Sequence, residues 1–170
     1  MATHLEILKK KLCSLTELKI ICDQLRKEKK MIVFTNGCFD LLHLGHIDYL
    51  SKAADLGDIL IIGLNSDKSV QKIKGSGRPI QDQKSRQLQL AALTFVDAVV
   101  LFDEDTPYNL IKDIKPDILV KGGDYNADEV VGADIVKQNG GKVIILPFVE
   151  GYSTSAIEMK IIANYKKGTN

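Results

Sequence analysis

Residues 31–46 read Met31-Ile-Val-Phe-Thr-Asn-Gly-Cys-Phe-Asp-Leu-Leu-His-Leu-Gly-His46, an apolar run followed by a polar turn that contains glycine. The run at 31–35 has the length and the Val and Ile content of a buried strand. Beyond the turn, residues 44–56 predict a helix that Gly57 stops. A strand, a short turn and a helix in this order are typical of the first unit of a parallel α/β sheet.

Four further runs of strand length follow, at 58–64, 98–102, 117–121 and 142–146. Helices are expected over about 82–95, from Thr106-Pro107 to before Pro116, over about 128–139, and from about Ser153 onwards. Residues 65–81 are expected to be irregular, because they are polar and contain Gly75, Gly77 and Pro79. This alternation predicts an α/β fold, a single doubly wound domain with a five-stranded parallel sheet in the Rossmann-like order 3-2-1-4-5.

The length of 170 residues suits one domain over 1–170. Ser14-Leu-Thr-Glu17 is a capping-box pattern that opens an amphipathic helix over 14–30. The core of the domain is expected over 31–165.

Charge and cysteine content exclude several classes of protein. Lys and Arg total 23 against 22 Asp and Glu, so no global field draws the chain to nucleic acid or to an anionic membrane. The three cysteines lack CxxC spacing, which favours neither a disulfide framework nor a cysteine zinc site. No apolar run approaches the roughly 18 residues of a membrane span, and no signal-peptide pattern opens the chain. We therefore expect a cytoplasmic protein.

Two glycine-containing turns are predicted to meet at one edge of the sheet. In the order 3-2-1-4-5, ligands bind where the order reverses, beyond the carboxyl ends of strands one and four. Strand one runs into Thr35-Asn-Gly-Cys-Phe-Asp40, and strand four runs into Lys121-Gly-Gly-Asp124. The first turn and the helix after it offer backbone N–H groups and the positive end of a helix dipole, which suit a phosphate. The sequence therefore predicts a nucleotide site without a Walker A or GxGxxG motif.

His43 and His46 are three residues apart in the first turn of the expected helix, so both imidazoles face one way. Gly45 between them leaves room for a ligand to approach the backbone. This spacing suits a two-imidazole phosphate clamp, but it also suits a metal pair or a capping and packing role.

These motifs together resemble the HxGH nucleotidyltransferase superfamily, in its cytidylyltransferase-like branch. Within that branch the chain is similar to the heptose 1-phosphate adenylyltransferases of ADP-heptose synthesis, over roughly residues 14 to 160. Beyond TNGCFD and HLGH, the resemblance is carried by Asn65-Ser-Asp-Lys-Ser-Val70, Lys74-Gly75, Arg78-Pro-Ile80, Val96-Asp97, Pro116-Asp-Ile-Leu-Val-Lys-Gly-Gly-Asp-Tyr125 and Ser153-Thr-Ser155.

The resemblance implies adenylyl transfer from ATP to D-glycero-β-D-manno-heptose 1-phosphate, for lipopolysaccharide or other surface heptose glycans, with Mg²⁺ carried on the ATP phosphates. It also implies a homodimer. The alternatives are a cytidylyltransferase acting on a polyol or amino-alcohol phosphate and a nucleotide-binding module without turnover. Phe148 stands where glycerol-phosphate cytidylyltransferases are expected to have an arginine, which weakens the cytidylyl alternative.

The resemblance also implies roles for individual residues. Lys74 and Lys72 would meet the triphosphate or lie in a solvated loop. Arg78 would hold the sugar phosphate or anchor its loop, and Asp40 would orient donors or cap the histidine helix. The predicted catalytic residues are His43, His46 and Lys74; the nucleotide-binding residues are Thr35, Asn36, Gly37, Cys38, Phe39, Gly45, Lys72, Lys121, Gly122, Asp124, Ser153, Thr154 and Ser155; the sugar-phosphate residues are Asp40 and Arg78.

Overall fold

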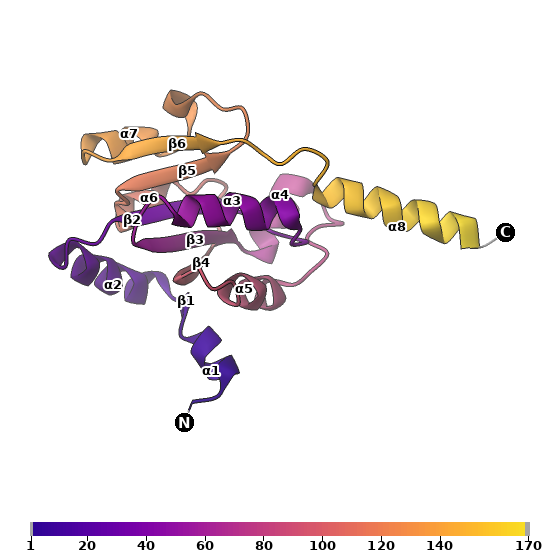
Figure 1. The fold of residues 1–170 in the computed structure, drawn as a ribbon, viewed down its shortest axis with the longest axis horizontal. Coiled ribbons are helices and arrows are strands. Elements are labelled where there is room, and N and C mark those ends of the chain that lie inside the picture. The colour runs from indigo at the N-terminus through magenta and orange to yellow at the C-terminus, as the bar shows by residue number, and fades with distance from the viewer. Residues whose placement is uncertain (1, 169–170) are drawn as a thin grey trace.

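A six-stranded parallel sheet forms the centre of the computed structural model, which describes residues 2–168 (Figure 1). Its order is β1-β4-β3-β2-β5-β6, and every neighbouring pair is parallel. The strands are β1 (Leu12–Cys13), β2 (Ile32–Gly37), β3 (Ile59–Asn65), β4 (Ala98–Phe102), β5 (Ile118–Gly122) and β6 (Lys142–Leu146).

The predicted count of five strands is wrong, because β1 adds a sixth strand at the edge beside β4. Leu12 pairs with Val99 and Cys13 with Val100. A strand of two residues is too short to show a periodic hydrophobic pattern, so the sequence could not predict it. The five expected strands are β2 to β6, and they lie in the order β4-β3-β2-β5-β6 within the larger sheet.

Helices link the strands and begin at recognisable caps. Ser14 caps α2 with the full capping box to Glu17, as predicted. The same box occurs at Thr3 and Glu6 of α1, a helix that was not predicted. The α-helices are α1 (His4–Lys9), α2 (Leu15–Lys27), α3 (Leu44–Ala54), α4 (Asp67–Lys74), α5 (Gln83–Ala91), α6 (Tyr108–Ile114), α7 (Ala133–Gln138) and α8 (Thr154–Gly168).

Two of the expected segments between strands differ from the structure. Residues 65–81 are not wholly irregular, because Ser66 caps α4 by accepting from the Ser69 N–H. The helix expected over 128–139 is broken into a 3-10 turn at Ala127–Glu129 and α7. Gly132 causes this break: its φ is +87°, and a Cβ there would lie 2.6 Å from the Ile111 side chain.

Both faces of the sheet are covered by helices, so the core has two halves. Leu18 of α2, Ile111 of α6 and Val136 of α7 pack on one face. Leu50 of α3 and Leu90 of α5 pack on the other. The β-branched runs of the central strands are therefore buried on both sides, as a parallel sheet requires.

Helix α8 projects away from the carboxyl edge of the sheet (Figure 1). Its exposed apolar side chains include Met159, Ile161 and Ile162. Within residues 2–168, no helix has the length and apolar character needed to cross a bilayer.

Candidate active site

The turns that follow β2 and β5 meet at the carboxyl edge of the sheet, as the sequence predicts. β2 pairs with both β3 and β5, so the strand order reverses at this point. Lys121 at the end of β5 donates to the Asn36 side-chain oxygen at the end of β2, over 3.3 Å. The two predicted motifs thus form one wall, and their polar groups face the same space.

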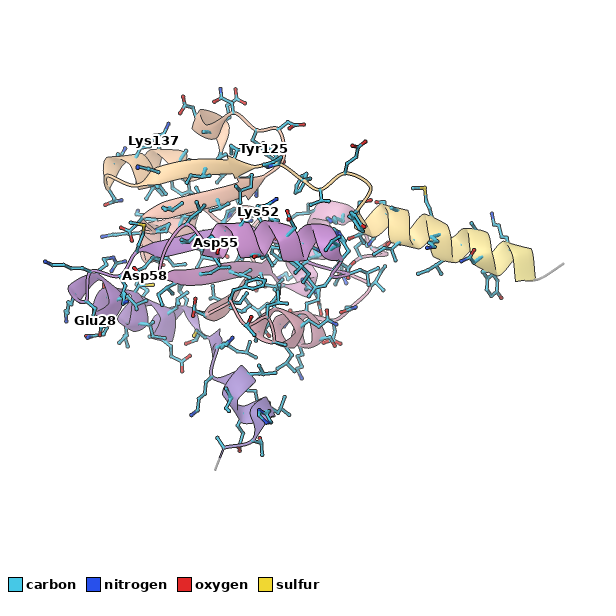
Figure 2. All side chains as sticks on the ribbon, in the orientation of Figure 1. Glu28, Lys52, Asp55, Asp58, Tyr125 and Lys137 are labelled. Carbon is cyan, nitrogen blue, oxygen red and sulfur yellow. The ribbon has the colours of Figure 1, made fainter. Side chains whose placement is uncertain are left out.

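Two adjoining cavities open at this wall. The first cavity, of about 210 Å³, is lined by Asn36, Gly37, Cys38, Phe39, Asp40, His46, Tyr49, Lys74, Lys121, Gly122, Tyr125, Phe148 and Thr154. The second cavity, of about 520 Å³, is lined by Asn36, Gly37, Cys38, Asn65, Ile73, Lys74, Asp105, Thr106, Pro107, Lys121, Tyr125, Glu129, Val130 and Val131. Figure 2 shows Tyr125, which lines both, at this edge of the sheet.

The junction between the cavities carries positive charge. Lys74 and Lys121 line both of them, together with the turn at Asn36, Gly37 and Cys38. Burial lowers the pKa of Lys121 from its usual value. Two anionic groups that enter from opposite sides would meet between these lysines.

The imidazoles of His43 and His46 stack at the start of α3, with ring centroids 3.8 Å apart. His43 is the N-cap residue, but its side chain makes no capping hydrogen bond. The Nδ1 atoms of both rings are buried and have no hydrogen-bond partner among the described residues. A Cβ at Gly45 would lie 3.1 Å from the His43 ring, so glycine is what allows this ring position.

Both histidines are held in the neutral form. Burial, the neighbouring His43 and the Lys74 charge lower the pKa of His46 to about 4, against a smaller opposite effect of the Leu41 backbone. Burial also lowers the pKa of His43. Each ring therefore offers one N–H donor and one acceptor near neutral pH. A bound polyphosphate would favour protonation of both rings.

Asp40 and Arg78 form a structural unit beside the first cavity. Asp40 is 2% exposed and accepts hydrogen bonds from the Ile80 and Gln81 N–H groups and from Arg78. Burial alone would raise the pKa of Asp40, but these donors outweigh it and lower the pKa. Arg78 also pairs with Glu158 of α8. Asp40 thus orients Arg78 and anchors its loop.

The other predicted residues of the β2 turn are placed by interior contacts. The Thr35 hydroxyl is buried and lies 2.6 Å from the Tyr49 hydroxyl, which donates to the Val120 carbonyl. Burial raises the pKa of Tyr49 to about 12, so this hydroxyl keeps its proton. Burial also raises the pKa of Cys38, whose thiol lies 3.9 Å from the Asn65 side-chain oxygen. A reactive thiolate at Cys38 is therefore disfavoured.

The remaining predicted residues divide between the cavity wall and its surroundings. Thr154 lines the first cavity, whereas the Ser153 hydroxyl accepts from the Ala156 N–H as a helix cap. Ser155 and Asp124 are exposed and line neither cavity. Lys72 also lies outside the two cavities, where it pairs with Asp105.

Arg86 is a residue of the site that sequence analysis missed. It is fully buried and donates to the carbonyl oxygens of Cys38, Asn65 and Gln81 and to the Asp67 carboxylate. It therefore ties the ends of β2 and β3 to the loop before α5. The sequence signal that could have identified Arg86 is its place on the apolar face of the expected helix, four residues before Leu90.

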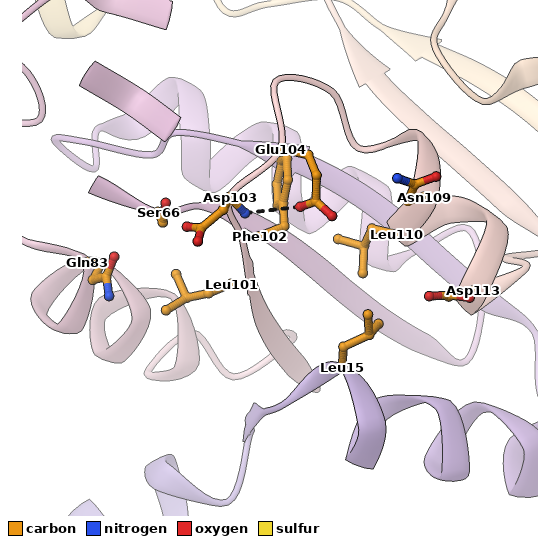
Figure 3. Close-up of a pocket in the computed structure, with 10 residues that line it drawn as sticks. All are labelled: Leu15, Ser66, Gln83, Leu101, Phe102, Asp103, Glu104, Asn109, Leu110 and Asp113. Carbon is orange, nitrogen blue, oxygen red and sulfur yellow. Dashed lines mark hydrogen bonds between the residues drawn. The ribbon is translucent and has the colours of Figure 1, made fainter. Parts of the chain in front are cut away.

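A third cavity, at the end of β4, shares no lining residue with the first two (Figure 3). Its charged lining residues are Asp103, Glu104 and Asp113, and no lysine or arginine lines it. An acidic lining repels phosphate, so this cavity does not suit a nucleotide.

Metal ligands are not clustered in the described part of the chain. Residues 2–168 contain no group of three or more His, Cys, Asp or Glu side chains placed to hold one ion.

The fold and the candidate site together define an α/β protein that gathers imidazole and lysine groups at the carboxyl edge of a parallel sheet. The chain belongs to the cytidylyltransferase-like family of nucleotidyltransferases, whose profile matches residues 34–160. This confirms the family inferred from the motifs.

Curated relatives and solved structures agree with this assignment. The bifunctional protein HldE of Nitratiruptor sp. is 60% identical over 141 residues, which are 83% of this chain and 30% of that protein. The bifunctional protein HldE of Campylobacter concisus is 57% identical over 151 residues, which are 89% of this chain and 31% of that protein. The chain thus spans about a third of the length of the curated relatives it matches.

Two solved structures share the fold. The lipopolysaccharide core biosynthesis protein of Thermoplasma volcanium is 32% identical, with a TM-score of 0.57, over 73% of this chain and 99% of that one. The pantoate-beta-alanine ligase of Francisella tularensis has a TM-score of 0.58 at 17% identity, over 88% of this chain and 76% of that one. The second likeness bears on the fold alone.

Proposed function

We propose that this chain transfers the adenylyl group of ATP to D-glycero-β-D-manno-heptose 1-phosphate and releases ADP-heptose and pyrophosphate. The carrying observation is the His43–His46 stack at the start of α3, in which His46 lines the first cavity together with Lys74 and Lys121. The family and the similarity to HldE proteins support a nucleotidyl transfer. The likeness to the lipopolysaccharide core biosynthesis protein of Thermoplasma volcanium supports a product used for lipopolysaccharide.

The chemistry needs positive charge more than a general base. An oxygen of the sugar phosphate forms a bond to the α-phosphorus, while the bond to the bridging oxygen breaks and pyrophosphate leaves with the electron pair. The attacking group is already an anion, so the barrier comes from anion meeting anion. His43, His46 and Lys74 would donate to the α-phosphate and the leaving oxygen, with contacts that strengthen as charge develops.

The two cavities suit the two substrates. Aromatic side chains and glycine backbone line the first cavity, which also contains His46, so it suits the nucleotide. Asn65, Asp105, Thr106 and Glu129 give the second cavity several hydrogen-bonding groups, which suit a sugar with many hydroxyls. Lys74 and Lys121 at the junction would meet the phosphates of both.

The other predicted residues take supporting parts in this proposal. Asn36, Gly37, Cys38, Phe39, Gly45, Lys121, Gly122, Asp124, Ser153, Thr154 and Ser155 form or flank the nucleotide subsite. Arg78 lines neither cavity and lies on the side of the first, so it would bind the sugar phosphate only where that phosphate reaches past the junction, after exchange of its Glu158 partner. Asp40 and Thr35 act as positioning residues. Lys72 would add charge at the outer rim. Mg²⁺ would be carried by the ATP phosphates and neutralise part of their charge.

We also propose that the chain acts as one domain over 1–170, in the cytoplasm, where ATP is available. The exposed apolar side chains of α8 favour a homodimer that covers them. Light scattering at working concentration checks this: a dimer is expected, and a monomer at all concentrations would contradict it.

Pyrophosphate release tests the reaction itself. The protein is incubated with Mg²⁺, each of the four nucleoside triphosphates, and a panel of heptose, hexose, polyol and amino-alcohol phosphates. Release is expected only with ATP and a heptose 1-phosphate. Release from CTP with a polyol or amino-alcohol phosphate would replace the proposal by a cytidylyl transfer. Nucleotide binding without release in any combination would identify a binding module.

A further inference from the structure

Phe148 is an exposed aromatic residue at the mouth of the first cavity, and the proposed mechanism gives it no part. It lies in the loop between β6 and α8, and its side chain is 65% exposed although the ring lines the cavity. Single exposed apolar side chains are common on protein surfaces, so it is the place of Phe148 at a cavity mouth that sets it apart.

One side of the Phe148 ring rests on a strip of backbone that has no side chains. A Cβ at Gly122 would lie 2.5 Å from this ring, and one at Gly123 would lie 3.1 Å from it. The Gly123 N–H donates to the Leu146 carbonyl, which fixes the strip relative to the start of the Phe148 loop. The two glycines thus let the far end of the ring, at Cε1, Cζ and Cε2, approach the backbone at the end of β5.

A second exposed aromatic residue borders the same strip. Tyr125 is 55% exposed, and a Cβ at Gly123 would lie 3.3 Å from its ring. Tyr49 lies deeper, with its ring centroid 6.5 Å from that of Phe148. The first cavity is therefore bordered by aromatic side chains, while Lys74 and Lys121 lie at its junction with the second cavity.

We propose that Phe148 is the residue on which the adenine ring of ATP stacks, and that Tyr125 borders the opposite side of the base. This proposal rests on the proposed function, because it assigns the base within that nucleotide subsite. Aromatic side chains bind nucleobases of every kind by stacking, and a base with a larger ring system gains more contact area. Phe148 therefore favours a purine through contact area, without the positive charge that an arginine at this place would add.

The test compares Phe148→Leu with Phe148→Tyr. Leucine keeps an apolar side chain on the Gly122–Gly123 strip but has no π-face, whereas tyrosine keeps the ring. Loss of a stacked base is expected to raise the KM for ATP by about 10-fold or more in Phe148→Leu. The kcat should change by less than about 3-fold, because the stack is made equally in the ground state and the transition state. Phe148→Tyr is expected to resemble the parent.

Calorimetric binding of α,β-methylene-ATP provides a readout that does not depend on turnover. Phe148→Leu should weaken this binding as much as it raises KM, and should weaken binding of the matching CTP analogue less. Ile20→Ala is the matched control, since Ile20 is 67% exposed on α2 and lines neither cavity. It should bind like the parent.

The outcomes separate the two proposals. Parent-like ATP binding in Phe148→Leu, with an unchanged melting temperature, would overturn the stacking assignment while leaving adenylyl transfer intact. A lower melting temperature with parent-like binding at low temperature would make Phe148 a packing residue and would also overturn it. If the parent released pyrophosphate only from CTP, the proposed function would fail, whatever the Phe148 variants did.

Discussion

The His43 and His46 imidazoles are stacked with their planes 21° apart, and the Phe39 ring meets His46 edge-on at 5.3 Å between centroids. Phe39 packs against His46, and the missing side chain at Gly45 leaves the room that the His43 ring occupies, so both rings are placed before any substrate binds. Preorganised donors cost no reorientation during reaction, which is why they contribute strongly to transition-state stabilisation. Two neutral imidazoles, of which the N-cap His43 makes no capping hydrogen bond among the described residues, fit that role better than a capping role.

Replacement of His46 by Asn is expected to reduce kcat by roughly 100-fold or more, with a smaller effect on ATP affinity. Asn keeps a donor of smaller reach, so the ring contact is lost while the polarity of the position remains. His43→Asn should behave similarly, with a larger share of the effect on binding. Single-turnover kinetics and a melting curve check this. Near-parent turnover at an unchanged melting temperature would mean that the two histidines are packing residues.

Acid should destabilise the protein through His46. Its pKa is about 4 in the folded chain against an ordinary 6.5, so the unfolded chain binds the extra proton first as the pH falls. The stability that this histidine contributes is therefore complete above about pH 6.5 and is lost progressively toward pH 4. Melting temperatures measured across this range should fall less steeply in His46→Asn than in the parent. Parallel slopes would show that His46 has no lowered pKa.

Lys74 and Lys72 form a matched pair two residues apart on one helix. Lys74 lines both cavities, whereas Lys72 pairs with Asp105 and lines neither. Lys74→Ala is expected to reduce kcat/KM by about 100-fold, and Lys72→Ala by less than about 3-fold. Initial rates at matched Mg²⁺ and ATP concentrations check the difference. Equal losses would mean that α4 shifts on substrate binding and brings both lysines to the phosphates.

The sequence predicted that the two glycine turns of the candidate site would meet, because the chemistry of two strand ends is local. Thr35 to Asp40 and Lys121 to Asp124 follow strands that are recognisable from their Val and Ile content, and neighbouring parallel strands bring their ends together. The contacts that hold these turns in place could be predicted much less well. The Arg86 contacts join residues 48 and 21 positions away, and no local pattern encodes such pairs.

The fold departs from expectation where local signals are weak or mixed. β1 has only two residues, and α4 is a polar helix whose buried members are Ser69 and Val70. Gly75 and Gly77 made the whole stretch resemble a loop, although both lie after the end of α4. Helix α4 is stabilised by its packing against β3 and by the Ser66 cap, and helix propensity alone would not form it.

Asp40→Asn should destabilise the loop that carries Arg78. The buried carboxylate accepts from two backbone N–H groups and from Arg78, and an amide replaces one acceptor oxygen with a donor. We expect a loss of about 1–3 kcal/mol in the free energy of unfolding and a higher KM for the sugar phosphate. Denaturant unfolding and KM values check this, with the exposed Asp55→Asn as control. A stable variant with only a raised KM would make Asp40 a direct ligand of the sugar phosphate.

Arg86→Lys is expected to be the most damaging conservative change in the chain. Lysine retains the charge but not the planar fork that reaches three carbonyl groups and the Asp67 carboxylate. Breaking a buried charged network costs about 3–5 kcal/mol, which for a chain of this size lowers the melting temperature by roughly 10 °C. Turnover measured well below melting should fall too, since the Cys38 and Asn65 carbonyls fix the ends of β2 and β3. Lys84→Ala on the exposed side of the same helix is the control and should melt like the parent. If Arg86→Lys melted within about 2 °C of the parent, the ends of β2 and β3 would be held by the sheet alone.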